Sequence, residues 1–161
     1  MLLKQADLFF GLSNDFVEHV MARAEKKVFD KGQFIFHEGQ AAQHFYTLVE
    51  GCVKLRMGIS GGCVFIINHL GESFGWSSIV MREEYSASAE CSEPTTVMEF
   101  DRDNLSEILM NYPTDGLVFM KQLAAMLGQR LIYSYRMANS ALGASEHQSY
   151  GSGNLMEAPV Q

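Results

Sequence analysis

The sequence has 161 residues, of which 47% are hydrophobic, so we expect one domain with a substantial core. Its formal net charge is −7, which excludes the broad basic surface that nucleic acids and anionic membranes require. Cys52, Cys63 and Cys91 are odd in number and widely spaced, so they predict neither a zinc ribbon nor an iron–sulfur cluster. Free thiols, the lack of a signal peptide and the lack of a membrane-length apolar run predict a cytoplasmic protein.

The N-terminal part has the periodicity of helices. Apolar residues recur at helical spacing between residues 8 and 24, which predicts a short helix followed by a second one over residues 16–24. Ser13, together with Asn14 and Asp15, is suited to cap the second helix.

Short apolar runs separated by glycines follow this helical part. They predict about seven short strands that recur every ten residues or so, and this spacing indicates an all-β sandwich or jelly roll with flanking helices. A turn at residues 60–62 is expected to join two of them as a hairpin. The clearest strands fall at residues 34–36, 45–50, 52–57, 63–69, 86–91 and 95–100.

Two helices are predicted after the strands. The first covers residues 103–110 and can be capped by Asp101 or Asp103, and the second covers residues 114–141. The long helix carries two apolar stripes, so it needs two partners, and we expect the strands on one side and the same helix of a second subunit on the other. The alternative is burial within one chain. Leu117, Met120, Ala124, Leu127 and Leu131 form one stripe, and Phe119, Leu123, Met126, Tyr133 and Met137 form the other.

These elements predict one domain over residues 1–141, which includes the dimerisation helix at 114–141. Residues 142–161 are rich in glycine and serine and predict a flexible tail.

Residues 71–89 read GESFGWSSIVMREEYSASA and are the stretch with the strongest functional signal. Gly71 and Gly75 allow the backbone to turn tightly and to approach a bound group closely. Ser77 and Ser78 follow, so N–H and hydroxyl donors gather in the kind of concavity that holds an anion. The alternative is an ordinary surface turn between two strands.

The order of the elements, and the runs GQFIFHEG at residues 32–39, FYTLVEGCV at 45–53 and GESFG at 71–75, resemble the cyclic nucleotide-binding domain. The similarity covers residues 8–139 and is strongest to the sensory domain of catabolite activator/FNR-type bacterial regulators. It implies a mainly β fold, a double-stranded β-helix jelly roll followed by a long C-terminal helix. It also places the family's phosphate-binding cassette on residues 71–89.

The sequence departs from the family at both charged anchors of the cassette. Trp76 stands where the family usually has a ribose-binding glutamate, and Tyr85 aligns with the phosphate-binding arginine. Truncating one partner of a buried charge pair costs about 2–5 kcal/mol, which is tens- to thousands-fold in affinity. We therefore expect weak binding of cAMP or cGMP. Either aromatic residue can contact a ligand or fill the pocket, and Arg82 is a candidate replacement anchor or else a solvated loop charge.

The resemblance implies a ligand-binding set on the cassette and the long helix. The helix positions are those that family members turn toward the base, although Leu131 can equally be dimer core and Ser134 a tolerated polar residue. The set is Phe74, Gly75, Trp76, Ser77, Ser78, Arg82, Tyr85, Ser86, Ala87, Leu131, Ser134 and Tyr135.

No enzyme is predicted. The five histidines lack the spacing of a cupin metal site, and neither a nucleophile elbow nor a P-loop occurs. Haem binding through a lone histidine, such as His37 or His69, stays open. About twenty residues follow the long helix, too few for a winged helix-turn-helix, so we expect no direct DNA binding.

Two functions remain. The first is a small-molecule-sensing regulatory module that signals through its long helix. The second is a degenerate module with a filled pocket, which only dimerises or docks a protein partner. The identity of the effector, and whether the chain is complete or a truncated regulator, do not follow from the sequence.

Overall fold

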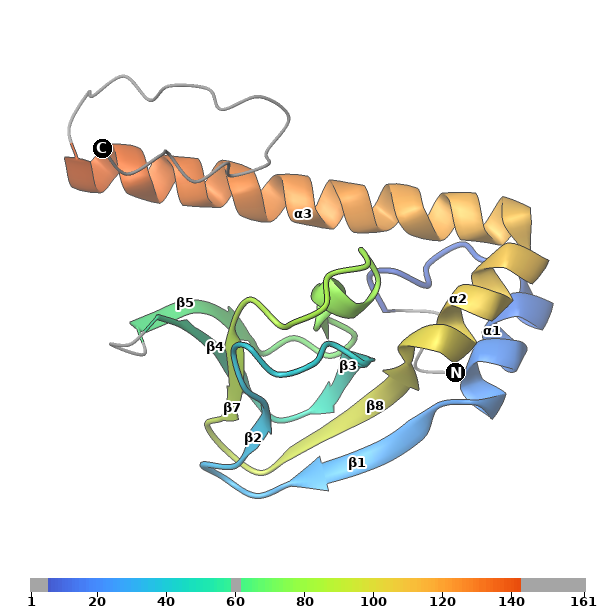
Figure 1. Ribbon diagram of the computed structural model, residues 1–161, viewed down its shortest axis with the longest axis horizontal. Helices are drawn as coiled ribbons and strands as arrows, with labels where there is room; N and C mark the ends of the chain where they lie inside the picture. Colours follow the sequence, from blue (N-terminus) through green and yellow to red (C-terminus); the bar gives the residue numbers. More distant parts are fainter. Residues whose placement is uncertain (1–5, 59–61, 143–161) are drawn as a thin grey trace. The chain divides into compact units, whose positions relative to one another are not determined.

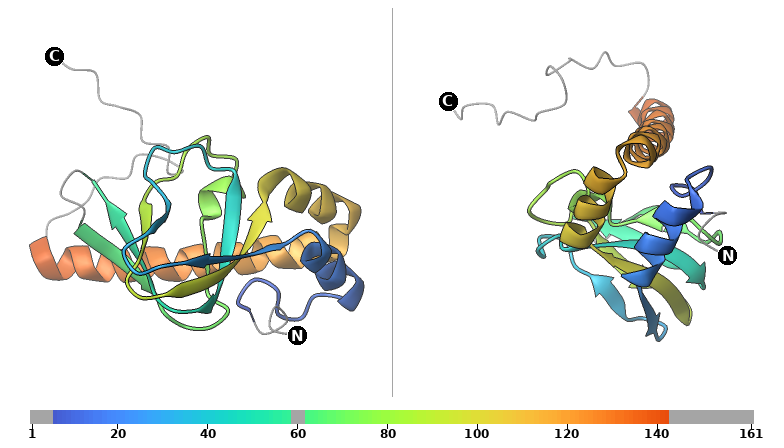
Figure 2. Two further views of the ribbon diagram at one scale, coloured as in Figure 1. Left: turned by 90° about the horizontal axis from the view of Figure 1, so that it is seen from below. Right: turned by 90° about the vertical axis from the view of Figure 1, so that its right-hand side faces the viewer.

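A computed structural model describes residues 6–58 and 62–142. Two four-stranded antiparallel sheets form a jelly roll, and helices α1 and α2 lie side by side at one end of it (Figures 1 and 2). The predicted fold class is therefore confirmed. One sheet has the order β1 (Glu25–Phe29), β8 (Thr95–Asp101), β3 (His44–Glu50), β6 (Ser73–Phe74), and the other has β2 (Phe34–Phe36), β7 (Ser88–Cys91), β4 (Val53–Met57), β5 (Gly62–Ile67).

Strand β3 is buried on both faces, and this explains why apolar residues dominate it on both sides of the central Thr47. Tyr46 and Leu48 face the core between the two sheets. Phe45 faces the helices, where its ring lies 5.8 Å from that of Phe100 and 6.4 Å from that of Phe119. The strand thus links the interior of the jelly roll to the helical layer.

The N-terminal segment forms one helix rather than two. Helix α1 (Asn14–Ala22) begins where expected, since the Ser13 side chain accepts a hydrogen bond from Phe16 N–H. The short helix predicted before it is wrong: residues 7–11 form turns. Gly11 lies at φ 75°, a left-handed conformation that breaks a right-handed helix.

Two strands are shorter than the sequence predicts. Strand β5 ends at Ile67 because the Glu72 carboxylate accepts the N–H groups of Asn68 and His69, each at 2.8 Å, and so holds them in a turn. Strand β7 begins at Ser88, since the two residues before it form a bend. The predicted hairpin turn at 60–62 lies largely outside the described residues.

The two helices after β8 agree with the sequence within a residue or two. Of the two candidate caps, Asp101 caps α2 (Arg102–Asn111) by accepting from Asn104 N–H at 2.9 Å. Helix α3 runs from Pro113 to Leu142. Its first turns belong to a compact unit that ends at Leu123, and a second unit begins at the next residue. Within the described residues, no helix is long and apolar enough to cross a membrane.

In the first turns of α3, the two predicted apolar stripes differ in burial. Phe119 and Leu123 are buried, as the stripe facing the strands requires, whereas Leu117 and Met120 are exposed. In the second unit, Leu131 of one stripe is exposed, and so are Tyr133 and Met137 of the other. The predicted tail lies outside the described residues, apart from Leu142 at the end of α3.

Candidate functional site

The cassette begins with two glycines that the fold requires. Gly71 lies at φ 88°, and a Cβ added there would lie 2.9 Å from Ala6 Cα. Gly75 lies at φ 77°, and its Cβ would lie 3.0 Å from the Tyr46 ring and 3.1 Å from the His44 carbonyl. Both positions combine a left-handed backbone with close approach of another segment, so any side chain there is strained.

A short 3-10 helix, η2 (Trp76–Ser78), follows Gly75. The Ser78 hydroxyl donates to the Gly75 carbonyl at 2.9 Å, so it holds the turn. Ser77 is also buried, and its carbonyl accepts from Arg82 N–H at 3.0 Å. Trp76 is half-buried. The Ser78 hydroxyl and the Ser77 carbonyl are therefore used in hydrogen bonds that hold the turn itself.

Tyr85 points into the jelly roll and fills part of its interior. Its ring stacks on Phe36, with centroids 3.8 Å apart and planes within 15°. Its hydroxyl donates to the His44 carbonyl at 2.7 Å and accepts from His44 N–H at 3.0 Å. Tyr46 and Phe74, which stack on each other at 5.3 Å, continue this aromatic cluster.

The electrostatic state of this cluster follows from its burial. Burial raises the pKa of Tyr85, and it raises the pKa of Tyr46 as well, with the nearby Tyr85 and Glu99 adding to the effect on Tyr46. Both phenols are therefore neutral near pH 7. At the position where the resemblance expects an arginine, a neutral ring occupies the interior.

The hydroxyl of Tyr85 hydrogen-bonds backbone groups of β3 that no residue of β6 pairs with. Strand β6 pairs with β3 only as far as Phe74 opposite Tyr46, so His44 lies beyond the end of that ladder. The phenol satisfies both backbone groups of His44 at this point. Sequence reasoning missed Phe36 and His44, because one looks like an ordinary strand residue and the other contributes only its backbone.

The backbone hydrogen bonding changes directly after Tyr85. Tyr85 N–H donates to the Gln40 carbonyl at 2.9 Å, and its carbonyl accepts from Gly39 N–H at 3.0 Å. Among the described residues, however, none accepts a hydrogen bond from the N–H of Ser86 or Ala87. Adjacent N–H groups in a bend, both on half-buried residues, can bind an anion.

The remaining predicted residues lie elsewhere. Arg82 is exposed next to the exposed Glu83 and Glu84, as a solvated loop charge would be. Leu131, Ser134 and Tyr135 belong to the second unit and are exposed there, with the Ser134 hydroxyl donating to the Arg130 carbonyl at 2.9 Å. Of the predicted set, the structure brings Phe74, Tyr85 and Ala87 together in one hydrophobic cluster. The ligand-binding role of the set remains a prediction.

Metal binding finds no support in the part of the chain that the structure describes. No three His, Cys, Asp or Glu side chains are grouped there as a metal site would need.

Comparison with known proteins gives one family. Its model, described as the cyclic nucleotide-binding domain, matches residues 26–112. The cyclic AMP receptor protein of Thermus thermophilus is 29% identical over 131 residues, which are 80% of this chain and 59% of that protein. The mouse cyclic nucleotide-gated channel beta-3 is 23% identical over 132 residues, which are 80% of this chain and 19% of the channel. The chain thus spans less than two thirds of either relative.

A solved structure agrees with this result. The sensor domain of the transcriptional regulator DNR from Pseudomonas aeruginosa is 27% identical and superposes with a TM-score of 0.68, covering 81% of this chain and 89% of that domain.

Proposed function

The chain belongs to the cyclic nucleotide-binding domain family, and we propose that it senses a small effector through a divergent cassette and signals through its long helix. The proposal describes a binding module rather than an enzyme. The effector is small, anionic or planar, and it contacts the Gly75–Ser78 turn, including Trp76, and the segment after Tyr85.

The observation that carries this proposal is the segment Tyr85–Ala87. A neutral, stacked ring replaces the guanidinium expected there, while the next two N–H groups have no acceptor among the described residues. An anion bound here is held by backbone dipoles alone, without a charge-assisted pair. Since a lost partner of that kind costs about 2–5 kcal/mol, cAMP and cGMP bind tens- to thousands-fold more weakly than to a cassette with its arginine.

The second step of the proposal concerns α3. Phe119 and Leu123 anchor the start of the helix in the core, and Phe119 contacts Phe45 of β3. Leu117 and Met120 are exposed on another face. A homodimer formed through the later part of α3, where Leu131 is exposed, gives the effector two states of one interface whose balance it can shift.

One observation favours the alternative of a filled, purely structural cassette. Tyr85 is almost fully buried and is held by two hydrogen bonds, so its ring cannot leave without exposing His44. In that case the chain only dimerises or docks a protein partner.

A thermal-shift screen of the full chain separates the two functions. The panel contains cyclic mono- and dinucleotides, ordinary nucleotides and haem. A ligand at a hundred times its dissociation constant adds about 2.7 kcal/mol of stability, which is a shift of several degrees. A shift that persists in Arg82→Gln, and in the control Arg23→Gln, supports binding by the backbone groups. A shift lost only in Arg82→Gln makes that arginine the anchor, and silence across the panel supports the filled cassette.

A further inference from the structure

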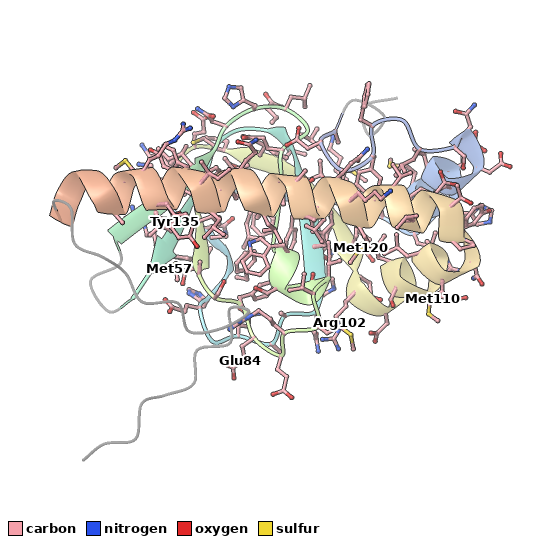
Figure 3. The ribbon with its side chains drawn as sticks, turned by 90° about the horizontal axis from the view of Figure 1, so that it is seen from above. Met57, Glu84, Arg102, Met110, Met120 and Tyr135 are labelled. Carbon is pink, nitrogen blue, oxygen red and sulfur yellow. The ribbon has the colours of Figure 1, made fainter. Side chains whose placement is uncertain are left out.

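A groove lies outside the cassette interior. This groove, of about 590 Å³, runs between η2 with the loop that follows it and the corner where α2 meets α3. Every lining residue belongs to the unit that ends at Leu123. Figure 3 labels three of them, Arg102, Met110 and Met120, around this corner. The volume falls within the range of about 300–1,000 Å³ that is usual for small-molecule sites.

The walls of the groove are apolar and adaptable. Ile79, Met81, Leu109, Met110, Leu117 and Met120 supply most of them. Met81 and Met110 are 89% and 79% exposed, and Leu117 is 58% exposed, so large apolar side chains face solvent here. Methionine side chains are flexible and fit irregular apolar ligands, and a contiguous exposed apolar patch marks a binding surface.

The backbone at the rim carries strain. Among the described residues, Met81 is the one non-glycine with a positive φ, at 58°. Such a conformation is uncommon for an unbranched apolar residue and costs of order 1 kcal/mol or more. The turn that ends η2 holds this backbone conformation, since Arg82 N–H donates to the Ser77 carbonyl at 3.0 Å across Met81. The turn leaves the apolar side chain of Met81 in solvent, where a ligand in the groove can cover it.

One end of the groove is polar, since Arg102, Asp103 and Ser106 line it. Arg102 and Ser106 both line it and lie one turn apart on α2, so they share a face of that helix. The hydrogen bonds of the Arg102 guanidinium to other described residues are long: it lies 3.5 Å from the Ala42 carbonyl and 3.4 Å from Asp103. Because Asp103 is exposed, a ligand carboxylate can replace it at Arg102 with little loss.

We propose that this groove binds a small amphipathic carboxylate: an aliphatic chain lies along the methionine and leucine walls, and its head group pairs with Arg102 and Ser106. A planar carboxylate matches the guanidinium fork with two parallel hydrogen bonds. A dianion such as a phosphate monoester is disfavoured, since it meets a single arginine with Asp103 beside it, in a chain of net charge −7. The site is distinct from the cassette interior and does not depend on the proposed cassette ligand.

The full chain offers its own probe for this site. Trp76 is the only tryptophan and lies in η2, two residues before the groove-lining Ser78. Dodecanoate, titrated below its micelle concentration, should change the Trp76 fluorescence in a saturable way. Dodecanol tests the apolar walls alone, and acetate tests the charged end alone, so both should bind more weakly than dodecanoate.

Two arginine variants form a matched pair. Arg102 and Arg23 are similarly exposed, with side chains at 39% and 41%, and Arg23 pairs with Glu107 of the same helix away from the groove. Arg102→Gln should weaken dodecanoate binding by about ten- to a hundredfold, the loss expected for a hydrogen bond to a charged group, and should leave dodecanol binding unchanged. Arg23→Gln should change neither.

The proposal has clear ways to fail. It is overturned if dodecanoate does not saturate, or if dodecanol binds equally well. It also fails if both arginine variants lose dodecanoate to the same extent, because that result indicates non-specific association. Should Arg102→Gln not fold, Ser106→Asp provides the same test: it places a carboxylate at the head-group end and should weaken dodecanoate while leaving dodecanol unaffected.

Discussion

The hydroxyl of Tyr85 is the feature of the cassette whose removal has the most calculable effect. In Tyr85→Phe the ring still stacks on Phe36, but the N–H and the carbonyl of His44 lose their partner at the end of the β3–β6 ladder. Each hydrogen bond contributes about 0.5–1.5 kcal/mol net, so the two together give a loss of about 2 kcal/mol. For a chain of this size, that lowers Tm by about 4–8 °C.

Urea unfolding followed by far-UV circular dichroism, with calorimetry for Tm, measures this loss directly. Tyr135→Phe is the control, since Tyr135 is exposed and its change should stay within about 0.5 kcal/mol. If Tyr85→Phe unfolds within 0.5 kcal/mol of the wild-type chain, the phenol does not hold His44, and the account of a ring fixed in the cassette is wrong.

Three further predictions follow from the same structure. Gly75→Ala should lower the free energy of unfolding by about 1–3 kcal/mol, because its Cβ meets the Tyr46 ring at a left-handed φ. Gly128→Ala should instead raise the free energy of unfolding by up to about 1 kcal/mol, because a Cβ at this helical position has open space around it. Burial raises the folded-state pKa of Tyr85, so its contribution to stability is intact below the unfolded pKa of about 10 and is lost as pH rises above that value. Urea titrations at a series of pH values should show this fall in the free energy of unfolding, and the fall should be smaller in Tyr85→Phe. Leu131→Glu should convert the proposed dimer to monomer in sedimentation velocity, with Gln129→Glu as an exposed control, and an unchanged dimer would place the interface elsewhere.

The sequence predicted the fold well because its signals are local and repeated. Glycines at turns and alternation along the strands depend on the backbone of each short segment, and Ser13 and Asp101 cap helices through contacts three residues away. The failures also have local causes. Gly11 turns a periodic apolar segment out of the helix, and Glu72 shortens β5 by capturing two N–H groups.

The arrangement inside the cassette depends on long-range contacts, so the sequence left two orientations of Tyr85 open. The contact that decides between them joins Tyr85 to the backbone of a residue 41 positions earlier. A backbone partner leaves no trace in residue types, and Phe36 reads as an ordinary strand residue. The groove at the α2–α3 corner was missed for the same reason, because its walls come from three separate segments.

Having Tyr85 where the family usually has an arginine changes how the stability of the folded cassette depends on a bound anion. A guanidinium at this position, enclosed by Phe36 and its neighbours, would be a buried charge that lacks a partner until an anion binds. The tyrosine is neutral and satisfied by His44, so the jelly roll is complete without an anion. An effector bound at Ser86 and Ala87 then adds its binding energy to an already stable cassette. In the proposed signalling through α3, its influence comes from its difference in affinity for the two states of the proposed dimer interface, and not from folding of the site itself.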